Sequence, residues 1–141
     1  MSIFILSPSY KMPLHDHPNM FGQLKVISGR LKVESYSRIP PSDDLLVKAE
    51  NVKILTESSE ASVLLPDVCN YHELTALDGQ PAAFYDILSP PYSEQDDVSE
   101  HARHCTFYRK TKVADDGGSN VIFRLTKTRT PSHYFCDTFK Y

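Results

Sequence analysis

The residues best suited to chemistry are two histidines one position apart, in the run Pro13-Leu14-His15-Asp16-His17-Pro18. In an extended chain, alternate side chains project to the same side, so His15 and His17 converge while Asp16 points away. The flanking prolines disfavour a helix here. Neutral imidazole is a common ligand of transition metals, so this spacing predicts half of a metal site on a strand. A solvated surface pair is the alternative.

A third ligand is available further along the chain. His72 lies in residues 71–75, which read as extended, and distant strands of a small barrel can line the same interior. On spacing alone, a half-buried polar residue is the alternative reading of His72. The remaining histidines, His101, His104 and His133, fall in loop-like or terminal contexts and are expected at the surface, with His104 as a reserve ligand.

Composition limits the function classes. The 141 residues are 40% apolar and 23% charged, which predicts one globular domain spanning 1–141. The formal net charge of −3 gives no electrostatic basis for binding nucleic acid or an anionic membrane. No apolar run is long enough to cross a bilayer, and the first residues lack the features of a secretory signal. Three cysteines without a CxxC pair indicate neither a disulfide framework nor a zinc ribbon, so a cytoplasmic location is expected.

Short β-prone runs separated by turn residues position these side chains. Alternation over residues 22–36 predicts a hairpin that turns at Ser28-Gly29. Further strand-like runs follow at 52–55, 61–65, 71–75, 82–88, 105–110 and 121–126. No apolar period of 3.6 residues persists for three turns, so the pattern predicts an all-β antiparallel sandwich or small barrel.

The pattern His15-x-His17, with a glycine closing the next turn and His72 downstream, resembles the two half-motifs of the cupin superfamily. Cupins usually carry a glutamate ligand four or five residues after the histidine pair. Here those positions are Phe21 and Gly22. The resemblance therefore narrows to the three-histidine cupins that oxidise thiols.

Three runs in the same order are similar to the family of cysteamine (2-aminoethanethiol) dioxygenases and plant cysteine oxidases. They are Met12-Pro13-Leu14-His15-Asp16-His17-Pro18-Asn19-Met20, Phe84-Tyr85-Asp86-Ile87-Leu88-Ser89-Pro90-Pro91-Tyr92 and Phe135-Cys136-Asp137-Thr138-Phe139-Lys140-Tyr141. The resemblance implies an all-β, cupin-like jelly-roll barrel of short antiparallel strands. Family members carry a longer segment before the histidine pair, which leaves open whether N-terminal strands of the barrel are missing.

The resemblance also implies a reaction and a set of roles. A monomer would bind Fe(II) through His15, His17 and His72, and would add both atoms of O2 to the sulfur of cysteamine or of a protein N-terminal cysteine. The product would be a sulfinic acid. Asp86 would lie near the substrate amine or orient a ligand, and Tyr92 would lie near the oxygen or the substrate. Zinc remains an open alternative metal. A non-catalytic, truncated cupin that binds metal and a partner or a Cys-initiating peptide is the alternative function.

Some family members carry a cysteine–tyrosine crosslink, and Cys105 matches the cysteine concerned. The partner position is Phe107 here, and Tyr108 is one residue off. A shift of one residue along a strand turns a side chain to the opposite face, so no crosslink is expected.

Overall fold

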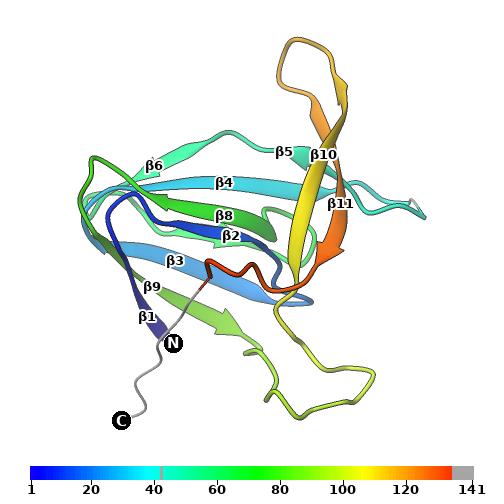
Figure 1. The fold of residues 1–141 in the computed structure, drawn as a ribbon, viewed down its shortest axis with the longest axis horizontal. Coiled ribbons are helices and arrows are strands. Elements are labelled where there is room, and N and C mark those ends of the chain that lie inside the picture. Colours follow the sequence, from blue (N-terminus) through cyan, green and yellow to red (C-terminus); the bar gives the residue numbers. More distant parts are fainter. Residues whose placement is uncertain (42, 135–141) are drawn as a thin grey trace.

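The computed structural model describes residues 1–41 and 43–134, which form eleven antiparallel strands (Figure 1). The strands are β1 (Ser2–Leu6), β2 (Lys11–His15), β3 (Phe21–Ser28), β4 (Leu31–Arg38), β5 (Leu46–Ala49), β6 (Lys53–Leu55), β7 (Ser62–Leu64), β8 (Tyr71–Ala76), β9 (Ala82–Ser89), β10 (Phe107–Asp115) and β11 (Val121–Thr128). These described residues contain no helix long and apolar enough to span a membrane.

Two sheets pack face to face around the first hydrophobic core. The smaller sheet has the order β1-β9-β3-β7, and it faces the part of the larger sheet formed by β2, β8, β4 and β6. Inward-pointing aliphatic and aromatic side chains from both sheets fill the space between them. They are Leu6, Met12, Leu24, Val26, Leu31, Val33, Leu55, Leu74, Ala76, Ala82 and Phe84. The prediction of an all-β, cupin-like jelly roll is confirmed.

A second core lies inside a closed ring of strands. The larger sheet runs β5-β11-β10-β2-β8-β4-β6, and β5 also pairs with β4, so six of these strands close on themselves. Leu14, Tyr36, Val47, Tyr71 and Leu125 are buried together there. Sequence reasoning missed β5, the short strand that closes the ring.

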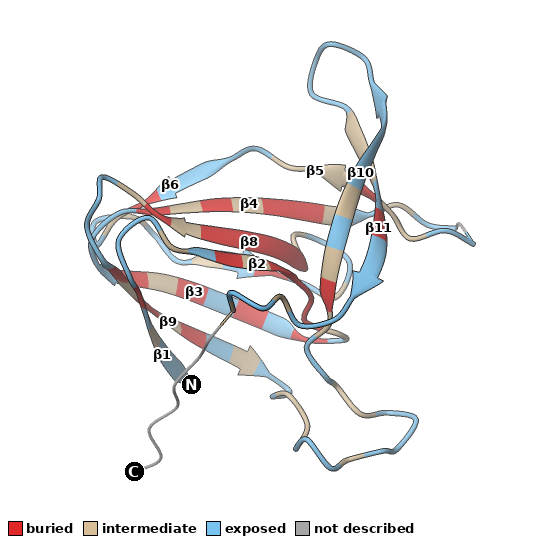
Figure 2. Ribbon diagram, viewed as in Figure 1, coloured by how far each residue is buried: buried red, intermediate tan, exposed pale blue. Residues whose placement is uncertain are grey.

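Strand β8 is shared by the two cores. Figure 2 shows it buried along almost its whole length. His72 and Leu74 alternate with Tyr71 and Glu73, and Leu74 lies in the first core while Tyr71 lies in the second. The carboxylate of Glu73 is buried on the side of the second core, where Lys11 and Lys110 pair with it. The strand that carries His72 is therefore fixed from both sides.

The predicted hairpin over residues 22–36 is wrong, although both of its strands exist. β3 pairs with β9 and β7, whereas β4 pairs with β8, β5 and β6, so the chain crosses between the two sheets at the turn. Gly29 has a φ of +79° there, and a Cβ at this position would overlap the backbone oxygen of Pro81. The turn residues were read correctly, but the strand partners are decided by packing between the sheets.

The last residue that the structure describes contacts the first core through its aromatic ring. Tyr134 packs on the first core, and its ring centroid lies 5.0 Å from that of Phe107. The predicted family run at 135–141 lies outside the described residues.

Candidate metal centre

An extra residue in β2 directs His15 into the space between the sheets. Met12 lies opposite Leu74 and His15 lies opposite His72, so β2 uses three steps where β8 uses two. This bulge places His15 on the same face as Met12, which strict alternation would not do. Pro13 lies in the bulge, where its missing N–H costs no ladder bond. Its carbonyl accepts the Nδ1–H of His15 at 2.7 Å, which leaves Nε2 as the free ligand atom.

His17 lies beyond the end of β2 and is held by Asn70. The backbone N–H of His17 donates to Asn70 Oδ1 at 3.0 Å, and Asn70 Nδ2 donates back to the carbonyl of His17 at 2.8 Å. The backbone carbonyl of Asn70 accepts the Nδ1–H of His17 at 2.8 Å, so Nε2 is again the free nitrogen. Sequence reasoning missed Asn70; its only signal was its position two residues before His72.

The structure brings the three predicted ligands together. The ring centroids of His15, His17 and His72 lie 4.5 to 4.9 Å apart, and their ligand atoms all lie within 4.8 Å of one another. His72 is 3% exposed, and its Nε2 is buried without a hydrogen-bond partner. A buried polar atom without a partner is costly unless something binds it. The three residues therefore fit a metal ion, and within the described chain the cluster contains no carboxylate.

Burial keeps all three imidazoles neutral, which is the form that binds metal. Desolvation lowers the pKa of His15, and it lowers the pKa of His17 to about 3 with a further contribution from His15. Desolvation also holds the pKa of His72 well below its usual value. A bound cation would meet no competing positive charge from the cluster at neutral pH.

Asp16, between the two histidines, points away from the cluster and anchors the segment. Its Oδ1 accepts the backbone N–H of Thr106 and its Oδ2 accepts the hydroxyl of Tyr108, each at 2.8 Å. The hydroxyl of Tyr92 donates to the backbone carbonyl of Asp16 at 2.5 Å, and its ring lies 5.9 Å from that of His17. Tyr92 thus lies beside the cluster with its hydroxyl bonded to the histidine segment.

Asp86 is a buried carboxyl group rather than a solvent-facing one. It lies opposite Leu24, a first-core residue, so its side chain faces the interior between the sheets that also contains His72. It is 6% exposed, and its Oδ1 has no hydrogen-bond partner. Desolvation raises the pKa of Asp86 to about 7.

The other predicted candidates lie outside the cluster. His101, His104 and His133 are exposed, and His104 Nε2 is bonded to the carbonyl of Asp97 at 2.7 Å, so His104 is not placed as a reserve ligand. Cys105 is exposed as a residue, yet desolvation of its thiol raises its pKa to about 12.

Comparison with known proteins identifies the family of this chain. The whole chain, residues 1–141, matches the PCO_ADO family. The chain belongs to this family. It is 34% identical over 131 residues to a 2-aminoethanethiol dioxygenase of Mus musculus, which covers 77% of this chain and 49% of the mouse protein. It is 36% identical over 112 residues to plant cysteine oxidase 2 of Arabidopsis thaliana, covering 75% of this chain and 38% of that one.

These family relatives are longer than the chain, which spans about half of the mouse protein and less of the plant one. Among solved structures, the chain resembles the capsular polysaccharide assembling protein CapF from Staphylococcus aureus. The TM-score is 0.48 at 12% identity, covering 67% of this chain and 24% of CapF. That likeness is too weak to support an argument.

Proposed function

We propose that this chain is an Fe(II)-dependent thiol dioxygenase that acts on cysteamine, on protein N-terminal cysteine, or on both. The observation that carries the proposal is the buried cluster of three neutral histidines, in a member of a family whose relatives are named as thiol-oxidising enzymes. Both oxygen atoms of O2 end on the sulfur, and the thiol supplies all four electrons, so no external reductant is needed.

Three neutral ligands suit a substrate that arrives as a thiolate. A protein carboxylate would cancel part of the metal's charge, whereas His15, His17 and His72 leave its full +2 charge for the sulfur. Fe(II), when bound, supplies the redox chemistry by which sulfur and O2 combine. The contacts from Pro13 and Asn70 hold the Nε2 atoms of the first two histidines in place, which lowers the cost of organising the site.

Asp86 and Tyr92 have different roles in the proposed enzyme. The buried Asp86 carboxyl, with one oxygen unpartnered, is suited to receive the ammonium group of an aminothiol or of a peptide N-terminus. An arriving cation favours the ionised carboxylate, so binding would lower the raised pKa of Asp86. Tyr92 acts as a positioning residue, because its hydroxyl holds the carbonyl of Asp16 between the two histidines.

A metal-binding cupin without turnover is the second candidate. The histidine cluster would bind a metal whether or not turnover follows. In that case the same histidines would bind metal, and the protein would bind a Cys-initiating peptide or a partner without oxidising it.

Anaerobic loading with Fe(II), followed by air and a thiol, tests the proposal. Cysteamine and a Cys-initiating peptide are offered separately and the products are weighed by mass spectrometry. A gain of two oxygen atoms that His72→Ala abolishes, and that the exposed control His101→Ala retains, supports a dioxygenase. Bound iron without oxygen gain supports the non-catalytic cupin. Failure of the chain to bind iron contradicts the ligand assignment.

A further inference from the structure

His72 lacks the hydrogen bond that orients each of the other two histidines in the cluster. The carbonyl of Pro13 accepts the Nδ1–H of His15. The carbonyl of Asn70 accepts the Nδ1–H of His17. In the described part of the chain, no protein atom forms a hydrogen bond with either ring nitrogen of His72. A metal-binding imidazole almost always donates its second N–H to a partner, which fixes the tautomer and the direction of the ring.

The neighbours of His72 in the larger sheet show where such a partner can lie. His15 on β2 lies opposite His72 on β8, and Ser35 on β4 lies opposite His72 on the other side. Directly opposed residues of antiparallel strands have neighbouring side chains on the same face of the sheet. His72 therefore has the histidine cluster on one side and Ser35 on the other. Because its Nε2 is the ligand atom of the cluster, Nδ1 is the nitrogen left for the Ser35 side.

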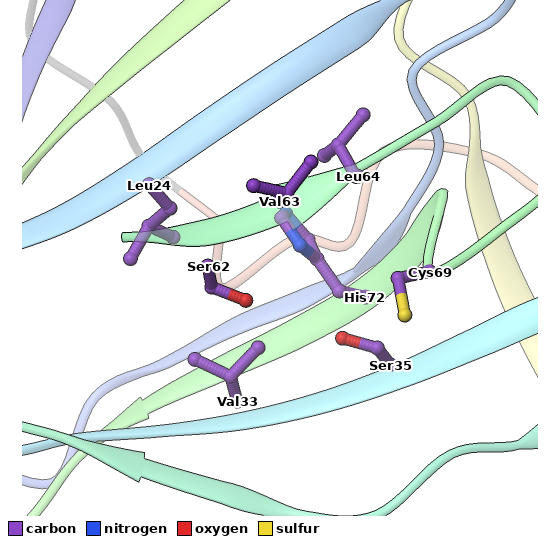
Figure 3. Close-up of a pocket in the computed structure, with 8 residues that line it drawn as sticks. All are labelled: Leu24, Val33, Ser35, Ser62, Val63, Leu64, Cys69 and His72. Carbon is purple, nitrogen blue, oxygen red and sulfur yellow. The ribbon is translucent and has the colours of Figure 1, made fainter. Parts of the chain in front are cut away.

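A small cavity is lined by both His72 and Ser35 (Figure 3). Four of its eight lining residues carry polar side-chain atoms, namely His72, Ser35, Ser62 and Cys69, and the other four are aliphatic. Figure 3 shows the hydroxyls of Ser35 and Ser62 pointing toward each other beside the His72 ring. The cavity volume is about 10 Å³, which is about the space that a single buried water requires.

We infer that this cavity holds one structural water that accepts the Nδ1–H of His72 and donates to the hydroxyl of Ser35. Ser35 is then a positioning residue, which orients the third histidine through the water. The inference rests on the proposed function, in which His72 is a metal ligand, and it assigns the groups that orient that ligand.

The polar groups around the cavity supply the bonds that a buried water needs, which usually number about three. The water accepts the Nδ1–H of His72 and donates one hydrogen to the oxygen of Ser35. The oxygen of Ser62 already accepts from Lys53 Nζ at 3.2 Å. The hydroxyl hydrogen of Ser62 can therefore be donated to the water. With these bonds, all three histidines have an acceptor at Nδ1 and a free Nε2.

The first test determines the tautomer of His72 in the full chain, kept free of metal. Desolvation keeps this imidazole neutral at neutral pH. A long-range proton–nitrogen correlation spectrum of histidine-labelled protein then shows which ring nitrogen carries the hydrogen. In the unmodified chain we expect it on Nδ1 in all three histidines. Ser35→Ala removes the hydroxyl, and is expected to give His72 a mixture of both tautomers while His15 and His17 stay unchanged.

Val63→Ala is the matched control, because Val63 lines the same cavity and has no polar side-chain atom. It is 48% exposed, and its truncation is expected to leave the His72 spectrum unchanged. The same His72 spectrum in Ser35→Ala as in the unmodified chain would overturn the role of Ser35. An equal change in both variants would also overturn it, because the packing of the cavity wall would then set the tautomer.

The second test detects the water itself in the unmodified chain. Nuclear Overhauser transfer from water is expected at the methyls of Val33 and Leu64, which line the cavity. No transfer is expected at the methyls of Val47 and Leu125, which are buried in the second core. Absence of transfer at the cavity methyls would overturn the inference, even if Ser35→Ala changed the tautomer, because the hydroxyl would then bond to the ring directly.

The third test measures what the orientation of His72 contributes to the site. Competition with a chelator under anaerobic conditions gives the affinity for Fe(II). Ser35→Ala is expected to bind Fe(II) about 10-fold more weakly than the unmodified chain, as is typical when a group that orients a ligand is lost. Val63→Ala is expected to bind it equally well. Unchanged affinity in Ser35→Ala would contradict a positioning role for Ser35.

These outcomes are distinguishable from those that test the proposed function. Absence of thiol oxidation by the unmodified, iron-loaded chain would refute the dioxygenase, whereas the tautomer and the water contacts are measured without metal or turnover. Thiol oxidation together with an unchanged tautomer in Ser35→Ala would refute the inference and leave the dioxygenase intact.

Discussion

Replacing Asn70 by alanine tests whether the folded protein prepares His17 for metal before the metal arrives. The variant removes the side-chain amide that bonds to both backbone groups of His17 and to the carbonyl of Leu65. The backbone carbonyl of Asn70, which accepts from the His17 ring, remains. The imidazole would keep its tautomer and lose the support of its own backbone.

The expected magnitude follows from these three hydrogen bonds. Each contributes about 1 kcal/mol net, so their joint loss destabilises the fold by about 3 kcal/mol. For a domain of this size that lowers the melting temperature by roughly 10 °C. Loss of groups that orient a ligand weakens metal binding by about 10- to 100-fold.

Two assays read these effects separately. Thermal unfolding of the metal-free chain reports the stability change, and competition with a chelator reports the affinity for Fe(II) under anaerobic conditions. Asn51→Ala, at an exposed position, is the matched control and is expected to change neither quantity. Asn70→Asp keeps the acceptor for the His17 N–H but sets a buried carboxylate oxygen against the carbonyls of His17 and Leu65, so it is expected to destabilise the fold at least as much as Asn70→Ala.

Unchanged metal affinity in Asn70→Ala, alongside the expected drop in stability, would refute this reasoning. The orientation of His17 would then depend on its ring contact alone. A loss of metal affinity without any loss of stability would also contradict it, because the same three hydrogen bonds are expected to stabilise the fold and to orient His17.

Three further substitutions test other features. Burial raises the pKa of Glu73, but bonds from two lysines outweigh it and the net pKa is lowered from 4.5. Glu73→Gln should therefore lower the free energy of unfolding by about 2 kcal/mol at neutral pH. This is less than the loss expected for a fully buried ion pair, because the two lysines are partly exposed. This loss of stability should shrink in acid as the pH falls through the lowered pKa of Glu73. Urea unfolding at several pH values measures it, and a difference between the unmodified chain and Glu73→Gln that does not change with pH would contradict the prediction. Asp86 has a folded pKa raised from 3.8 to about 7, so its ionisation opposes folding as the pH rises across that interval. The metal-free Asp86→Asn chain should lack that fall in melting temperature, and parallel pH curves would contradict it. Gly29→Ala should lower the melting temperature more than Gly117→Ala. Both glycines have positive φ, but only at Gly29 would a Cβ meet a backbone atom. Equal decreases in melting temperature would show that the backbone strain at positive φ, and not the contact with Pro81, sets the cost.

The features that depend on neighbouring residues could be predicted well from the sequence. The pair His15 and His17 was recognisable because imidazoles two residues apart share a face, and His72 entered through the resemblance to a family motif. Strand positions followed from alternation, since the turn residues and apolar spacing are properties of neighbouring residues. These predictions needed no knowledge of which strands meet.

Features that depend on distant partners were not predictable. The bulge at Pro13 exists only relative to β8, so no local pattern in β2 shows it. Asn70 reads as an ordinary turn residue until its contact with His17 is seen. The turn at Gly29 was predicted correctly, but β3 and β4 pair with strands of different sheets, and their apolar faces meet across the first core. The short β5 follows a proline-rich loop and has too few residues to show alternation.

The closed ring also affects the order in which the protein can fold. Its seam joins Leu46 on β5 to Arg124 on β11, a contact between distant points of the chain. Closing so long a loop costs entropy that is recovered only when the seam forms, which slows folding. On the ribosome, all three histidines emerge before β10 and β11 do. The strands that bear the histidines are therefore synthesised first, and one side of β8 stays uncovered until β10 and β11 complete the second core.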